Sequence, residues 1–152
     1  MALVLQSRLL ETIRQELGGT YSITATPDQE KFPRPAYTVR IDWTCDPPRT
    51  ADLVQRVLQE IDLAKTVPLS PGQMALLRGA LLREFDANRQ NNGYLVDEIS
   101  GRYEDGDRAD AATVVNMSER IAALTAEAIQ QAAQTYLNTG SYVKVTLMPE
   151  SR

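Results

Sequence analysis

The sequence has 152 residues, enough for one domain with a proper core, and a formal net charge of −4. The acidic balance argues against a nucleic-acid partner, because phosphate backbones are bound by basic surfaces. The chain has no histidine, which excludes a Ser/His/Asp triad, a Cys/His pair and an H-E-x-x-H zinc helix. No apolar run approaches the roughly 18 residues of a membrane span, so no membrane partner is expected. A single cysteine, Cys45, allows no internal disulfide.

The first third of the chain predicts one helix and two strands. Apolar residues recur at spacings of three and four over residues 3–17, which predicts a helix that ends at Gly18 and Gly19. Residues 20–26 are rich in β-branched and aromatic types and predict a strand. Three prolines within residues 27–35 predict a loop. Residues 36–45 alternate between apolar and polar, which predicts a half-buried strand antiparallel to the first.

The middle of the chain predicts helices. After two prolines, residues 50–61 carry an apolar stripe at helical spacing. Ser70 and Gln73 then form a capping box, with Pro71 at the first helical position. The helix that follows carries on one face Met74, Leu77, Leu81 and Phe85. It pauses at Asn91, Asn92 and Gly93 and resumes as a shorter helix through Tyr103.

A last helix and a closing strand complete the predicted elements. Thr125 is the expected N-cap of a helix over residues 126–137. The segment "SYVKVTLM" predicts a strand with Val143, Val145 and Leu147 on one face. The segregation of strands and helices predicts a single α+β domain over residues 1–152, an antiparallel sheet with helices packed on one face. Three strands are few for so many helices, so we expect truncation at the N-terminal strands and self-association through an uncovered sheet edge.

Three segments carry a resemblance to a known family: "LVLQSRLLETIRQELGGTYSITA", "LSPGQMALLRGALLREFDANRQNNGYLVDEIS" and "LTAEAIQQAAQTYLNTGSYVKVTLMPE". Together they resemble the C-terminal domain of the pitrilysin/insulinase family of zinc metallopeptidases, in particular its bacterial periplasmic branch. The resemblance implies repeated α+β (LuxS/MPP-like) domains in two halves that close around a peptide. The N-terminal half would hold zinc on an H-x-x-E-H motif. This chain would hold no cofactor, and its location would be periplasmic.

The resemblance also implies a site. In this family the half without zinc supplies an arginine and a tyrosine, seven residues apart, to the substrate, and the matching residues are Arg14 and Tyr21. The family more often has glutamate where Gln15 stands, a departure that touches neither side chain. A guanidinium and a phenol are both able to donate hydrogen bonds to a peptide carbonyl and to the oxyanion that develops on it.

The residues themselves are compatible with that site and with a simpler alternative. Arg14 lies about 40° from Leu10 on a helical wheel, at the border of the apolar stripe, and Tyr21 opens the following strand. In the simpler alternative, Arg14 pairs with Glu11 or another carboxylate, and Tyr21 only packs against its neighbours.

Three other groups of residues have structural explanations. Tyr37 and Trp43, on one face of the second strand, are expected in the core rather than stacked on a peptide. The run of Asn91, Asn92, Gly93 and Tyr94 is explained by a helix interruption. The spacing of Asp105, Asp107 and Asp110 lacks the full calcium-loop pattern, so it predicts a solvated charged loop and no metal site.

Two functions follow as hypotheses. In the first, the chain is the substrate-binding domain of a zinc endopeptidase. It binds a peptide or unfolded protein, works with the N-terminal catalytic half of the same protein, and is inactive alone. In the second, it is a non-catalytic scaffold or interaction domain of the same fold. An H-x-x-E-H motif upstream of Met1 would favour the first hypothesis.

Overall fold

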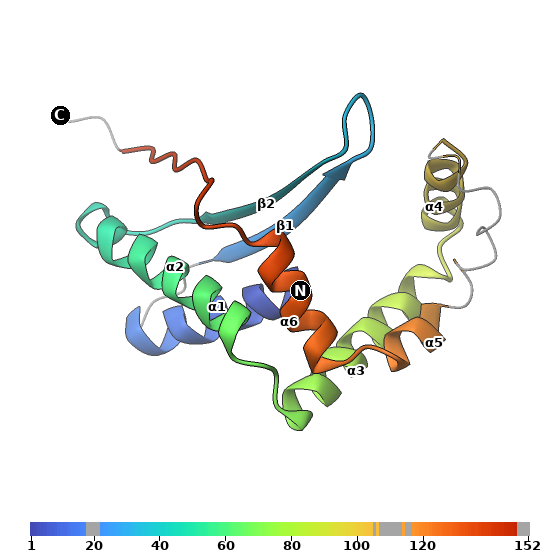
Figure 1. Cartoon of the computed structure of the whole chain (residues 1–152), viewed down its shortest axis with the longest axis horizontal. Coiled ribbons are helices and arrows are strands. Elements are labelled where there is room, and N and C mark those ends of the chain that lie inside the picture. The colour runs from blue at the N-terminus through green and yellow to red at the C-terminus, as the bar shows by residue number, and fades with distance from the viewer. Residues whose placement is uncertain (18–21, 105, 107–113, 115–116, 149–152) are drawn as a thin grey trace. The chain divides into compact units, whose positions relative to one another are not determined.

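The computed structural model describes residues 1–17, 22–104, 106, 114 and 117–148. The described elements, in chain order, are α1 (Ala2–Leu17), β1 (Ile23–Glu30), β2 (Ala36–Trp43), a 3₁₀ turn η1 (Pro47–Arg49), α2 (Thr50–Thr66), α3 (Pro71–Asn88), α4 (Asn92–Glu104), α5 (Met117–Ala122) and α6 (Ala126–Tyr136) (Figure 1). The chain forms two compact units. One comprises Met1–Pro68 with Ile129–Arg152, and the other is Leu69–Ala128.

The strands β1 and β2 form an antiparallel hairpin in the first unit. Its register pairs Ile23 with Trp43 and Glu30 with Ala36. The predicted boundary between strand and loop is wrong, since residues 27–30 belong to β1 rather than to a loop. Proline has no backbone N–H to donate. β1 tolerates Pro27 because it is an edge strand, with no second neighbouring strand that would need this N–H. The second strand is close to its predicted extent, and Val39, Ile41 and Trp43 are half-buried as expected.

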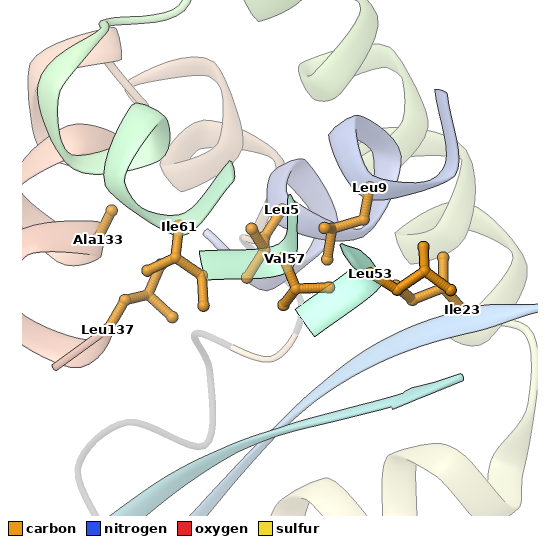
Figure 2. Close-up of a cluster of buried hydrophobic side chains, with 8 residues drawn as sticks. All are labelled: Leu5, Leu9, Ile23, Leu53, Val57, Ile61, Ala133 and Leu137. Atoms are coloured by element: carbon orange, nitrogen blue, oxygen red, sulfur yellow. The ribbon is translucent and has the colours of Figure 1, made fainter. Parts of the chain in front are cut away.

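Helices α1 and α2 build the core of the first unit on one face of the hairpin (Figure 2). Leu5 and Leu9 of α1 are fully buried, at 0% exposure each. The rest of the buried cluster comes from β1, α2, α6 and the residue after α6: Ile23, Leu53, Val57, Ile61, Ala133 and Leu137. The predicted stripe on α2 is therefore confirmed. On α1 the prediction is confirmed for Leu9, which is buried, and for Leu10, which is half-buried, whereas the side chains of Ile13 and Leu17 lie outside the described residues. The α+β class, with helices against a face of antiparallel strands, is confirmed with them.

The second unit begins with the predicted capping box. The Ser70 hydroxyl accepts a hydrogen bond from the Gln73 N–H at 3.3 Å, and the Gln73 amide oxygen accepts one from the Ser70 N–H at 2.9 Å. Met74 and Phe85 are buried along α3, and the Arg78 guanidinium donates from its Nε and its Nη2 to the Leu124 carbonyl. α3 also packs against α5, a short helix that the sequence did not predict because six residues show too little periodicity.

The predicted closing strand is wrong in this structure. Residues 142–148 are described but form no strand, and the sheet of the described chain contains only β1 and β2. The three apolar side chains that alternate along this segment are almost fully exposed, at 89% for Val143, 79% for Val145 and 93% for Leu147. An alternating pattern shows which face of a segment would be buried if it joined a sheet. Whether the segment forms a strand depends on whether the tertiary structure places the edge of another strand beside it.

Candidate functional site

The candidate pair Arg14 and Tyr21 lies at the connection between α1 and β1. Arg14 belongs to α1, whose backbone is described, but its side chain lies outside the described residues. Tyr21 lies wholly outside them, as do the two glycines that precede it. The structure therefore describes the surroundings of the pair only through α1, which precedes the connection, and β1, which follows it.

A buried carboxylate fastens α1 to α2. Glu60 is 4% exposed and accepts hydrogen bonds from two residues one helical turn apart on α1. The Arg8 Nε lies 3.2 Å from its Oε2, and the Thr12 hydroxyl lies 3.1 Å from its Oε1. Both carboxylate oxygens are thereby satisfied, and one partner is cationic. These two hydrogen bonds fix the rotation of α1 about its own axis and its position along α2. The second of them, from Thr12, lies two residues before Arg14.

Glu60 was not predicted from the sequence as a buried group, although its position carries a signal. Glu60 lies seven residues after Leu53 and three after Val57, so it occupies a position on the buried stripe of α2. A glutamate at such a position needs a cationic or hydrogen-bonding partner on the facing element. The partner arginine was not predictable, because its helix is brought to α2 only by the tertiary fold.

The other side of the connection is anchored as well. The Ala25 N–H donates to the Gln6 side-chain oxygen at 3.3 Å, which joins β1 directly to α1. Ile23, two residues after Tyr21, is 2% exposed and belongs to the same buried cluster as Leu9. The connection from α1 to β1 therefore starts and ends on elements that are held by one core.

We expect Glu60→Ala to destabilise the protein strongly. Truncation leaves the Arg8 guanidinium, 20% exposed, without its carboxylate, and leaves the Thr12 hydroxyl without its acceptor. Breaking a buried pair of this kind costs about 3 kcal/mol of unfolding free energy. The control is Asp42→Ala, which breaks the exposed Arg40–Asp42 pair and should cost less than about 1 kcal/mol. Urea denaturation of both variants measures the difference, and equal losses would contradict a structural role for Glu60.

The predicted core aromatics are placed differently from one another. Trp43 packs against the buried cluster, as expected. Tyr37 does not, since it is 48% exposed and lies against the end of α6. The Tyr37 and Tyr136 rings pack edge-on with their centroids 4.8 Å apart. The Tyr37 hydroxyl donates a hydrogen bond to the Thr135 carbonyl at 3.0 Å. The prediction that Tyr37 is a core residue is therefore wrong, because the hairpin extends past the cluster that covers Trp43.

The predicted interruption at Asn91 is confirmed as a cap between α3 and α4. The Asn91 side-chain oxygen accepts hydrogen bonds from the N–H groups of Gly93 at 2.9 Å and Tyr94 at 3.4 Å, which opens α4. Partial burial raises the pKa of the Tyr94 phenol, and the carboxylates of Glu98 and Glu84 raise it further. The Tyr94 phenol is therefore protonated near neutral pH. The capping hydrogen bonds are sufficient to explain an asparagine at position 91.

No metal site is assigned. Within the part of the chain that the structure describes, no three residues among Cys, Asp and Glu come together as a metal would require. Asp105, Asp107 and Asp110 lie outside that part, so the prediction of a solvated loop there stays a prediction. None of the described helices combines the length and apolar character needed to cross a membrane.

Comparisons with known proteins find a similar fold in one solved structure. No family model matches the sequence, and a search of curated proteins finds no match either. Among solved structures, the chain is similar to the periplasmic protease PqqL from Escherichia coli, with a TM-score of 0.71 and 18% sequence identity. The likeness covers 90% of this chain but only 15% of PqqL. The expected fold is confirmed: the chain has the α+β fold of a domain from a periplasmic protease.

Proposed function

We propose that this chain is a substrate-binding domain of a zinc endopeptidase of the pitrilysin/insulinase family. The observation that carries the proposal is the fold likeness to a periplasmic protease over 90% of the chain. The R-Q-E-L-G-G-T-Y motif supports it, since it falls where α1 gives way to β1. Fold alone does not determine activity, so the functional part of the proposal depends on Arg14 and Tyr21.

The proposed role of Arg14 and Tyr21 is to bind one carbonyl group of a peptide substrate. Arg14 in the last turn of α1 and Tyr21 just before β1 would each be able to donate hydrogen bonds to a carbonyl oxygen. Donors of this kind stabilise the transition state more than the substrate when they point at the oxygen on which charge develops. The pair would therefore assist hydrolysis from a half of the protein that carries no metal.

The zinc belongs, in this proposal, to an N-terminal half of the same protein. When bound there it would supply Lewis-acid polarisation of the peptide carbonyl. The present sequence has no histidine, and its single cysteine cannot complete a zinc site of about three protein ligands. The substrate class is an extended peptide or an unfolded protein, and the location is the periplasm, as the name of the similar protease suggests.

We expect the isolated 152-residue chain neither to bind zinc tightly nor to cleave peptides. The reason is the ligand set, which lacks histidine and clustered cysteine. Metal analysis after dialysis and a fluorogenic peptide assay measure the two properties. Stoichiometric zinc, or peptidase activity that a chelator abolishes, would contradict the assignment of the zinc to another part of the protein.

A scaffold or interaction domain is the second candidate, because the same fold without a metal-bearing partner would perform no hydrolysis. The genomic sequence upstream of Met1 distinguishes the two candidates. An H-x-x-E-H motif in frame upstream supports the endopeptidase. An upstream region that carries the fold without this motif favours the scaffold.

A further inference from the structure

The helix α4, in the second unit, presents a row of apolar side chains to solvent. None of its residues is buried. Val96 is 61% exposed, Tyr103 is 53% exposed and Ile99 is 37% exposed. Their spacings of three and four residues place these side chains within about 60° of one another around the helix axis. A single exposed apolar side chain is ordinary, but several in one row mark an interaction surface, which we call the α4 ridge.

Two carboxylates border one side of the α4 ridge. Asp97 and Glu104 are both exposed, and they are seven residues apart, so they lie one above the other along the helix. Their line is displaced by about 80–100° from Val96 around the axis. The sequence that follows has the same sign of charge, since residues 105–110 contain three aspartates and one arginine. The border of the α4 ridge is therefore acidic.

No exposed cation of α4 offsets these carboxylates. Arg102 is the only basic residue of this helix, and its position lies on the opposite side of the α4 ridge from Asp97. Its side chain is 18% exposed, and its Nη2 lies 3.9 Å from the Glu98 Oε2. The cation is thus already paired within the helix. An approaching partner meets apolar side chains and unbalanced negative charge.

This charge pattern decides between classes of partner. Amphipathic helices that lie on anionic membranes carry Lys and Arg beside the apolar face, where α4 carries acids. A second copy of α4 would bring only further carboxylates and the already paired Arg102. A peptide segment that combines apolar residues with Lys or Arg complements both the α4 ridge and its border.

We propose that the α4 ridge binds a basic amphipathic helix of another polypeptide. The apolar residues of that helix pack on Val96, Ile99 and Tyr103, and its Lys or Arg side chains pair with Asp97 and Glu104. Anchors at positions i, i+3 and i+7 are the spacing at which one helix is recognised along its length. Tyr103 adds a ring over which a cation is able to lie.

The surface is separate from the candidate substrate-binding pair of the first unit. Binding to the α4 ridge requires neither that pair nor a zinc-bearing half of the protein. Failure of this proposal and failure of the proposed function are therefore distinguishable, because one is measured by peptide binding to the 152-residue chain and the other by hydrolysis.

Three synthetic peptides test the charge requirement on the 152-residue chain. Each is a labelled helical peptide of about 15 residues with the same leucine face, bordered by lysine, glutamine or glutamate. We expect the lysine peptide to bind at least about tenfold more tightly than the glutamate peptide at low salt, with the glutamine peptide between them. Fluorescence anisotropy measures the affinities. Equal affinities for the three peptides would overturn the proposal.

Apolar variants locate the binding of the lysine peptide. Tyr103→Ala should weaken it at least about tenfold, because aromatic anchors carry much of the affinity of an interface. Val96→Ala, which favours the helix, should weaken it about threefold. The matched control is Leu76→Ala, which truncates a side chain that is 76% exposed on α3 of the same unit. An equal loss in the control and in Tyr103→Ala would contradict binding at the α4 ridge.

The acidic border has its own variant. The double substitution Asp97→Asn with Glu104→Gln should weaken the lysine peptide about fivefold at low salt and remove most of its advantage over the glutamate peptide. Glu119→Gln is the control, since Glu119 is an exposed carboxylate on α5 of the same unit. If Glu119→Gln reduces affinity as much as the double variant, the peptide responds only to net charge, and the proposal is overturned.

Two measurements check for the other occupants. Flotation with phosphatidylglycerol vesicles detects membrane binding, and sedimentation velocity detects self-association. We expect Tyr103→Ala to change neither result. Vesicle binding or a dimer that this substitution abolishes would overturn the proposal, because a membrane or a second copy would then be the partner of the α4 ridge.

Discussion

Leu5→Ala and Leu9→Ala should each lower the free energy of unfolding by about 3–5 kcal/mol, among the largest effects expected of any single substitution in this chain. Both side chains are fully buried, at 0% exposure, between the hairpin and α2. Truncation removes apolar contacts and leaves a cavity. Hydrogen bonds from Arg8 to Glu60 of α2 and from the Ala25 N–H of β1 to Gln6 hold α1 in place, so the helix has little freedom to move into the cavity.

Leu3→Ala is the matched control, since it deletes the same atoms from the same helix at a position that is 44% exposed. Its cost should remain below about 1 kcal/mol. Chemical denaturation measures all three variants with one method. If Leu3→Ala costs as much as Leu9→Ala, the assignment of the buried face of α1 is wrong.

Arg14→Ala and Tyr21→Phe should each lower kcat on the order of 10²-fold in a protein that joins this chain to the proposed zinc-bearing half. The expected reason is the loss of one donor to the oxygen that gains negative charge in the transition state. Substrate affinity should change less than the rate, because the interaction strengthens as the charge develops. Steady-state kinetics separates kcat from KM for both variants.

Thermal melts of the same variants provide the control. If Arg14 only pairs with a carboxylate and Tyr21 only packs, their replacement should lower the melting temperature and leave kcat unchanged. Glu11→Gln is a useful companion, because Glu11 is exposed on the same helix and stands three residues before Arg14, a spacing at which two helical side chains can pair. The substrate-binding role predicts that Glu11→Gln keeps the parental kcat and that Tyr21→Phe does not.

Much of the helical architecture could be predicted from the sequence, because the signals are local. The stripe of Leu53, Val57 and Ile61 determines which face of α2 is buried. The capping box of Ser70 and Gln73 determines where α3 begins. In each case the hydrogen bonds and side-chain contacts of the helix join residues only a few positions apart, so one short stretch of sequence is sufficient to predict them.

The sheet was predicted less well, because strand pairing depends on distant segments. Pro27 suggested a loop, yet an edge strand tolerates it. The alternation of Val143 and Val145 suggested a paired strand, yet it only shows what the segment would bury. For the candidate site, Arg14 and Tyr21 were identified by family resemblance. Glu60, which holds the helix that carries Arg14, depends on a tertiary contact that no spacing rule contains.

The most direct test of the central claim is the binding of two ligands to the proposed two-half protein with and without the Tyr21 hydroxyl. One ligand is a substrate peptide, and the other is its phosphinic analogue, which imitates the tetrahedral, negatively charged transition state. The account predicts that Tyr21→Phe weakens binding of the analogue on the order of 10²-fold and binding of the peptide by much less. Equal affinities of the parent and Tyr21→Phe proteins for the analogue would contradict the claim that this domain contributes to the chemistry.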